Sequence, residues 1–133
     1  MESPENEEAG LLPLERAVLE LMLDKEGEPY ETIRKQLGLA TVERREYSGV
    51  GFFTHFRYPP SIQRTLPNMH VNDVGMDLPG VEHGAGFLLF VRNGVAEMLE
   101  GYTYGEYWPE RTDDFRVFRV NVFRSQCDVQ PDE

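Results

Sequence analysis

The chain has little of what marks secreted, disulfide-stabilised or membrane-spanning proteins. It contains one cysteine, Cys127, among 133 residues, so an internal disulfide is excluded, as is typical of a protein from a reducing compartment. The N-terminus is acidic and lacks the basic and apolar segments of a signal peptide. No apolar run reaches the roughly 18 residues that a membrane-spanning helix needs. These absences predict a cytoplasmic protein with no membrane partner.

The familiar signatures of nucleotide-binding and catalytic sites are also missing. The sequence has no P-loop, no GxGxxG, no GxSxG, no CxxC and no HExxH. The three histidines are separated by 15 and 13 residues, which is not the spacing of metal ligands. The sequence therefore predicts neither a cofactor nor a metal site. The missing catalytic motifs favour a protein that is not an enzyme, but they leave the question open.

Acidic residues outnumber basic ones, 24 against 13, and the formal net charge is −11. Residues 1–10 contribute −4 of this charge and residues 127–133 contribute −3, so the rest of the chain carries only −4. Acidic segments of this kind are typical of solvated tails. We therefore expect a disordered tail over 1–10, a single domain over 11–126 and a polar tail over 127–133. A domain without a basic face is not expected to bind nucleic acid.

Two stretches near the N-terminus predict helices. Between residues 13 and 22, apolar side chains recur with the spacing of one helix face, Pro13 suits the first turn, and Gly27 is expected to end the helix. A second helix is expected over 29–37, with Gly38 in the left-handed conformation that often follows a helix. The stretch IRKQLGLATVERRE has a faint helix-turn-helix appearance. The acidic domain and the strand-like residues that follow favour a structural interpretation instead.

The most informative local pattern is a pair of apolar runs, 86–92 and 95–104, joined by Asn93-Gly94. Asn-Gly favours a type I′ turn, because both of its positions need a positive φ. A regular hairpin around this turn pairs Phe90 with Glu97 and Leu88 with Leu99. Both faces of this hairpin are largely apolar, which predicts a central hairpin that is covered on both sides.

Further strands are expected over 41–58, as one long strand or two, over 74–78 and over 115–124. Residues 61–69 are expected to form a surface loop. Helices followed by strands indicate an α+β fold, with two N-terminal helices packed on one antiparallel sheet of about five strands. An exposed sheet edge at 115–124 would also allow a homodimer.

Glu100 and His83 are the candidate acid–base residues. Glu100 lies among apolar residues of the hairpin, and such a setting raises the pKa of a carboxyl group. Alternatively, Glu97 and Glu100 reach solvent or pair with an arginine of the last strand. This is the preferred interpretation for Glu97, whereas the two are evenly balanced for Glu100. His83 follows Glu82 at the start of the hairpin, where a general base could be presented.

The best candidate for a binding surface is an aromatic segment after the hairpin. Tyrosine and tryptophan offer a large rigid contact area and dominate interface hot spots. The alternative for the tryptophan is that it covers the open end of the sheet. Glu106 and Glu110 flank the segment and favour a cationic ligand or partner. The candidate binding residues are Tyr102, Tyr104, Tyr107 and Trp108.

Two stretches, GVGFFTHFRYP at 49–59 and HGAGFLLFVRNGVAEMLEGYTYGEYWPE at 83–110, resemble a group of small uncharacterised bacterial proteins. The resemblance rests on GVGFFT, HGAGF, the MLEGYTYGE run and the WPE ending, and the two stretches cover about 40 of the 133 residues. It implies a bacterial, cytoplasmic, single-domain α+β protein. It brings with it no activity, ligand or site residue.

Two functions remain in view. The first is a non-catalytic binding domain that holds a protein partner, for which the acidic charge favours a basic one; an inhibitor or immunity-type protein is one form of it. The second is an enzyme or small-ligand protein with a pocket between helices and sheet that uses Glu100 and His83. The two differ in whether Glu100 and His83 converge in one concave site.

Overall fold

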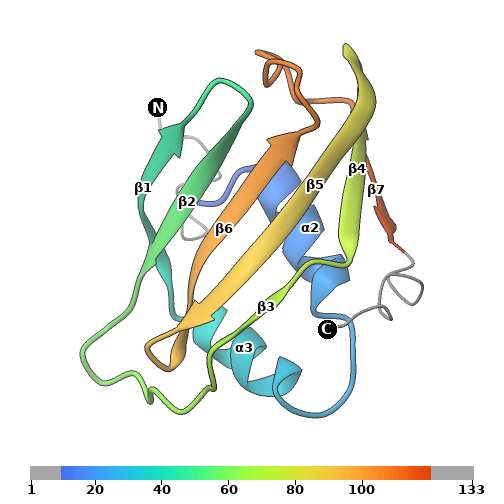
Figure 1. Ribbon diagram of the computed structural model, residues 1–133. Helices are drawn as coiled ribbons and strands as arrows, with labels where there is room; N and C mark the ends of the chain where they lie inside the picture. Colours follow the sequence, from blue (N-terminus) through green and yellow to red (C-terminus); the bar gives the residue numbers. More distant parts are fainter. Residues whose placement is uncertain (1–9, 121–133) are drawn as a thin grey trace.

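The computed structural model describes residues 10–120, which form two helices followed by seven strands (Figure 1). The predicted tails therefore lie outside the described residues, apart from Gly10. The helices are α2 (Pro13–Met22) and α3 (Tyr30–Leu37), and the strands are β1 (Thr41–Tyr47), β2 (Gly51–Arg57), β3 (Met69–Val71), β4 (Val74–Leu78), β5 (Val81–Arg92), β6 (Val95–Thr103) and β7 (Arg116–Arg119).

All seven strands belong to one antiparallel sheet with the order β1-β2-β6-β5-β4-β7. The twelve-residue strand β5 is long enough to pair with two short strands in succession, β4 near its start and β3 near its end. The prediction of an α+β fold with an antiparallel sheet is confirmed. The strand number is larger than predicted, because 41–58 divides into β1 and β2 and the predicted loop 61–69 ends in β3.

The turn at the centre of the sheet has the predicted conformation, with φ of 58° at Asn93 and 80° at Gly94. The predicted register beyond the turn is wrong. A bulge places Glu97 outside the regular pairing, so that Phe90 pairs with Met98 and Leu88 pairs with Glu100. Since side chains alternate along a strand, this one-residue shift turns Leu99 toward the helices and Glu100 away from them.

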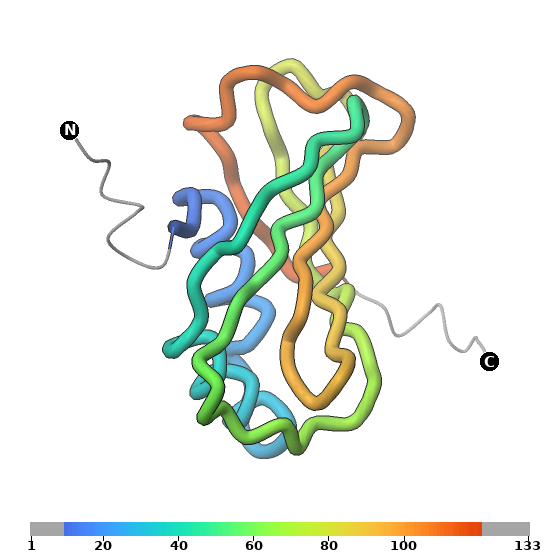
Figure 2. The backbone as a smooth tube through the Cα atoms, turned by 90° about the vertical axis from the view of Figure 1, so that its left-hand side faces the viewer, coloured from blue at the N-terminus to red at the C-terminus, as the bar shows by residue number. Residues whose placement is uncertain are grey.

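The two faces of the sheet have different surroundings. Both helices lie on one side of it (Figure 2), and this side contains fully buried residues such as Phe52, Phe87 and Leu99. No described helix or strand crosses the other side, so the expected cover on both faces is absent there. The hydrophobic side chains of this outer face remain half-exposed; they are Phe53, Leu88, Phe90, Met98, Tyr102 and Phe118.

A buried ion pair fixes α2 against the β1–β2 side of the sheet. Glu15 on α2 has no exposed surface, and its Oε1 lies 2.7 Å from Nη2 of Arg45 on β1. Its Oε2 accepts hydrogen bonds from Arg45 Nε at 2.9 Å and from the Thr54 hydroxyl on β2. The backbone N–H of Leu12 donates to Oε1 at 2.8 Å. The carboxylate therefore joins one helix to two strands.

A buried amide similarly attaches α3 to the end of the central hairpin. Gln36 donates through Nε2 to the Gly94 carbonyl at 3.0 Å and accepts through Oε1 from the Ala96 N–H at 3.1 Å. The residue after this helix differs from the prediction: Gly38 has a right-handed φ of −66°, not a left-handed one. Its helical conformation continues the last turn of α3 toward β1.

Candidate functional site

Glu100 is on the outer face of the sheet, between Phe53 of β2 and Leu88 of β5. Partial burial among these neighbours raises the pKa of its carboxyl group, as in the first of the two settings considered for it above. The arginines considered as its partners are engaged elsewhere or lie outside the described residues. Arg116 pairs with Asp77, and Arg119 pairs with Asp73 at 2.9 Å.

His83 is exposed near the start of β5. It precedes Leu88, the cross-strand neighbour of Glu100, by five residues, which corresponds to roughly 16 Å along a strand. The two candidate acid–base residues are thus too far apart to act on one reacting atom. Glu100 also faces away from the helices, so it does not line a pocket between helices and sheet.

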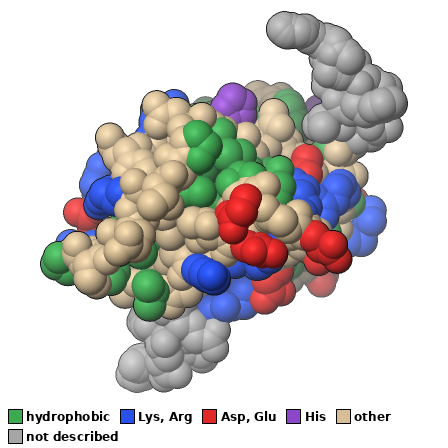
Figure 3. Space-filling model, turned by 90° about the horizontal axis from the view of Figure 1, so that it is seen from below, with side chains coloured by type: hydrophobic (Ala, Val, Ile, Leu, Met, Phe, Trp, Pro, Cys, Tyr) green, Lys and Arg blue, Asp and Glu red, His purple; other side chains and the backbone are tan. Residues whose placement is uncertain are grey.

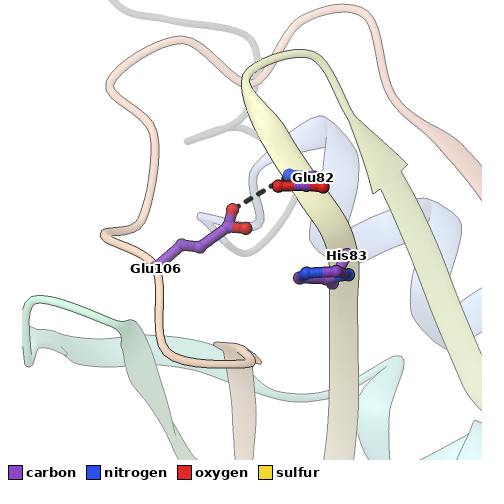
Figure 4. Close-up of side chains that lie close together, drawn as sticks. All are labelled: Glu82, His83 and Glu106. Carbon is purple, nitrogen blue, oxygen red and sulfur yellow. Dashed lines mark hydrogen bonds between the residues drawn. The ribbon is translucent and has the colours of Figure 1, made fainter.

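His83 instead lies close to two carboxylates, one of them distant in sequence (Figure 4). The ligand atoms of Glu82, His83 and Glu106 all lie within 4.8 Å of one another. The Glu106 carboxylate accepts a hydrogen bond from the backbone N–H of Glu82 at 2.9 Å. Two of the three residues are exposed and the third is half-exposed. Their proximity is the sole feature of the described residues that favours an ion, and exposed carboxylates commonly lie together without one.

The aromatic segment after β6 divides between the two faces of the sheet. The Tyr102 ring covers Gly86 on the outer face, and Tyr104 meets it edge-on with the ring centroids 5.6 Å apart. Burial raises the pKa of Tyr102 to about 12. Tyr104 and Tyr107 point away from the core, with 59% and 84% of their surface exposed.

Trp108 folds back over the open end of the core. Its ring is edge-on to Phe52, with the centroids 5.0 Å apart, and also edge-on to Phe87. Its backbone N–H donates to the Gly49 carbonyl at 2.7 Å, which ties the segment to the β1–β2 turn. The structure therefore places the tryptophan as the core cover that the sequence offered as an alternative.

A cavity of about 360 Å³ opens beside Trp108 on the helix side of the sheet. No local pattern in the sequence predicts this cavity, because its walls come from three separate parts of the chain. The sequence could at most have drawn attention to Tyr47, a large aromatic residue just before the turn at Ser48-Gly49. The lining residues are Leu12, Leu14, Tyr47, Gly49, Phe52, Trp108, Pro109, Glu110 and Thr112.

A larger groove, of about 730 Å³, runs between α2 and α3. Leucines form its floor, and charged residues of both signs, such as Arg16, Glu20 and Arg34, surround them. Acidic and basic side chains also lie intermixed on the end of the molecule seen in Figure 3. A surface of mixed sign does not select a ligand of either charge, so this groove has no chemistry that identifies an occupant.

Comparisons with known proteins identify no relative of this chain. No protein-family model, no curated protein and no solved structure matches the chain. Neither helix in residues 10–120 combines the length and the apolar character needed to cross a membrane.

Proposed function

We propose that the protein is a non-catalytic binding domain of the bacterial cytoplasm that holds a protein partner at one end of its sheet. The observation that carries this proposal is a set of exposed hydrophobic side chains at one end of the sheet, the aromatic end, made up of Tyr47, Val50, Tyr104 and Tyr107. Tyrosine is enriched in protein interaction surfaces.

The two segments that form the aromatic end are joined to each other by backbone hydrogen bonds. Thr103 donates to the Val50 carbonyl at 2.8 Å, next to the bond from Trp108 to Gly49. The exposed side chains therefore stand on a shared framework at the upper end of the sheet (Figure 1). A framework of this kind lowers the entropy cost of binding, because less of the surface must be ordered on contact.

The partner that fits this surface is basic. Glu106 and Glu110 belong to the same segment as the exposed tyrosines, and the whole chain carries a net charge of −11. Long-range attraction would bring a cationic partner to this surface, after which the aromatic rings supply contact area. An inhibitor or immunity-type protein would act in this way, as a small acidic protein that covers a basic target.

The test compares three forms of the tagged full chain in capture from the producing cell, at low and moderate salt. The double variant Tyr104→Ala/Tyr107→Ala should lose a stoichiometric partner that the wild type retains. Leu39→Ala is the matched control, because Leu39 is as exposed as Tyr104, at 59%, but lies after α3. Equal capture by the wild type and the double variant would contradict the proposal.

The alternative, an enzyme or small-ligand protein that uses Glu100 and His83, has less support. These residues do not converge, and Glu100 faces away from the helices. If a substrate is found, Glu100→Gln tests the alternative directly, since an unchanged turnover would remove this carboxylate from the mechanism.

A further inference from the structure

Three aromatic side chains, Tyr47, Phe52 and Trp108, line the cavity beside the β1–β2 turn. The Phe52 ring is edge-on to Trp108 at an interplanar angle of 70° and tilted by 42° to Tyr47, with the Tyr47 and Phe52 centroids 5.9 Å apart. The rings therefore approach the cavity from different directions. Tyr47 is 62% exposed, so this wall is open to solvent, while Phe52 is buried and forms the inner part.

The charges around this cavity favour a positively charged occupant. Glu110 lines the cavity, and none of the other described lining residues is charged. The nearby cations are already paired: Arg45 binds Glu15, and Arg111 lies 3.1 Å from Asp113. A carboxylate without a cation in the same cavity, next to three aromatic rings, is the combination that attracts a cation to a ring face.

The size of the cavity limits what can enter it. A volume of about 360 Å³ is near the lower end of the roughly 300–1,000 Å³ of small-molecule sites. A single long side chain fits this volume. Among cationic side chains, arginine matches the walls best, because its planar guanidinium stacks on aromatic rings and pairs with a carboxylate at the same time.

We propose that this cavity receives the guanidinium group of an arginine side chain from the basic partner. The inference rests on the proposed function, whose partner chemistry it specifies. The arginine stem would pass Tyr47 at the open wall, and the guanidinium would lie among the three rings with Glu110 as its carboxylate partner.

The single tryptophan of the chain gives a direct measurement. The full-length protein is titrated with N-acetyl-arginine amide while Trp108 fluorescence is recorded, and N-acetyl-citrulline amide, a neutral compound of nearly the same shape, is the control ligand. A saturable change is expected with the arginine compound alone. No saturable change, or an equal response to the citrulline compound, overturns the proposal.

Variants of the cavity and of the surface separate the two interactions. Glu110→Gln should weaken binding of the arginine compound roughly two- to five-fold at low salt, which is the size of an exposed charge contact. Tyr47→Ala should also weaken this binding. Because Tyr47 is largely exposed, circular dichroism can readily exclude a folding defect in this variant. Leu39→Ala is the matched control, since Leu39 is about as exposed as Tyr47, at 59% against 62%, and does not line the cavity. An equal loss with Leu39→Ala contradicts the proposal.

The same variants distinguish this inference from the proposed function. If the tyrosine double variant loses its protein partner but Glu110→Gln and Tyr47→Ala retain it fully, the binding function stands and the arginine site is wrong. If the arginine compound binds but no partner depends on Tyr104 and Tyr107, the arginine site stands and the proposed function is wrong.

Discussion

The side chain of Glu15 links helix α2 to strands β1 and β2. Its carboxylate is fully buried and is bound by Arg45, by Thr54 and by the backbone of Leu12. A buried carboxylate with this many partners is stable only while all of them remain in place. Losing it would leave the guanidinium of Arg45 beside the core without a counter-charge.

Glu15→Ala is therefore expected to lower the free energy of unfolding by about 3 kcal/mol, the range measured when one partner of a buried ion pair is removed. Urea unfolding followed by circular dichroism measures the change. Glu20→Ala on the exposed side of the same helix is the control, and we expect it to change stability by less than about 0.5 kcal/mol. Similar losses in both variants would argue against a special role for Glu15.

Glu100 predicts a dependence of stability on pH. Desolvation raises the pKa of its carboxyl group in the folded chain, so folding favours the protonated form. This contribution is present below the unfolded-state pKa and is lost as the pH rises through the raised value. Glu100→Gln removes the titration, so the stability of the variant relative to wild type should be greater at pH 7 than at pH 3. Urea unfolding at both values measures this, and an equal difference at both would refute it.

At the scale of the elements, the turn between β5 and β6 joins several parts of the fold. The Gly94 carbonyl accepts hydrogen bonds from Gln36 of α3 and from the backbone N–H of Leu66. Gly94 also has a positive φ of 80°, and a Cβ placed on it would lie 2.5 Å from the Arg64 carbonyl carbon. Position 94 therefore favours glycine for two independent reasons, its positive φ and the lack of space for a Cβ.

A pair of glycine variants separates these reasons. Gly80→Ala meets only the conformational cost of a positive φ, because nothing lies within 4 Å of its Cβ, and should destabilise by about 1 kcal/mol. Gly94→Ala adds the collision with Arg64 and should destabilise by at least about 1 kcal/mol more. Thermal unfolding of both variants provides the measurement. Equal losses would show that the loop around Arg64 moves freely out of the way.

Local chemistry explains which elements could be predicted. The Asn93-Gly94 turn and the helix that begins at Pro13 depend on neighbouring residues, and both are present, although the helix ends at Met22 and not at Gly27 as predicted. The bulge at Glu97 could not be predicted, because it depends on which face of the sheet the helices cover. The same limit applies to the cavity, since Tyr47, Phe52 and Trp108 come together only when β2 pairs with β6 and the segment after β6 folds back.

At the scale of the whole molecule, the net charge of −11 predicts how association with a basic partner responds to salt. Charge attraction beyond roughly 10 Å is screened at about 0.1 M salt. The association rate with the captured partner should fall about tenfold or more between low and high salt, while the dissociation rate changes less. Stopped-flow measurement of Trp108 fluorescence can follow both rates.

A charge-reduced full chain provides the comparison for this prediction. The variant Glu2→Gln/Glu5→Gln/Glu7→Gln/Glu8→Gln removes four negative charges without altering the described residues. Its association rate should depend less steeply on salt than that of the wild type. An identical slope would locate the attraction in the domain itself, and an absence of any salt dependence would contradict charge steering altogether.

The strand order also has a consequence for synthesis of the chain. Strand β2 pairs with β1, which precedes it, but its other neighbour, β6, begins only at Val95. Likewise, β4 cannot pair with β7 until the chain reaches Arg116. While a ribosome makes the residues in between, the edge of β2 that pairs with β6 has no partner, and Phe52 lacks its ring contacts with Phe87 and Trp108. Such late pairing slows folding and prolongs the exposure of apolar surface. The nascent chain should therefore be a client of chaperones until the last strand has emerged.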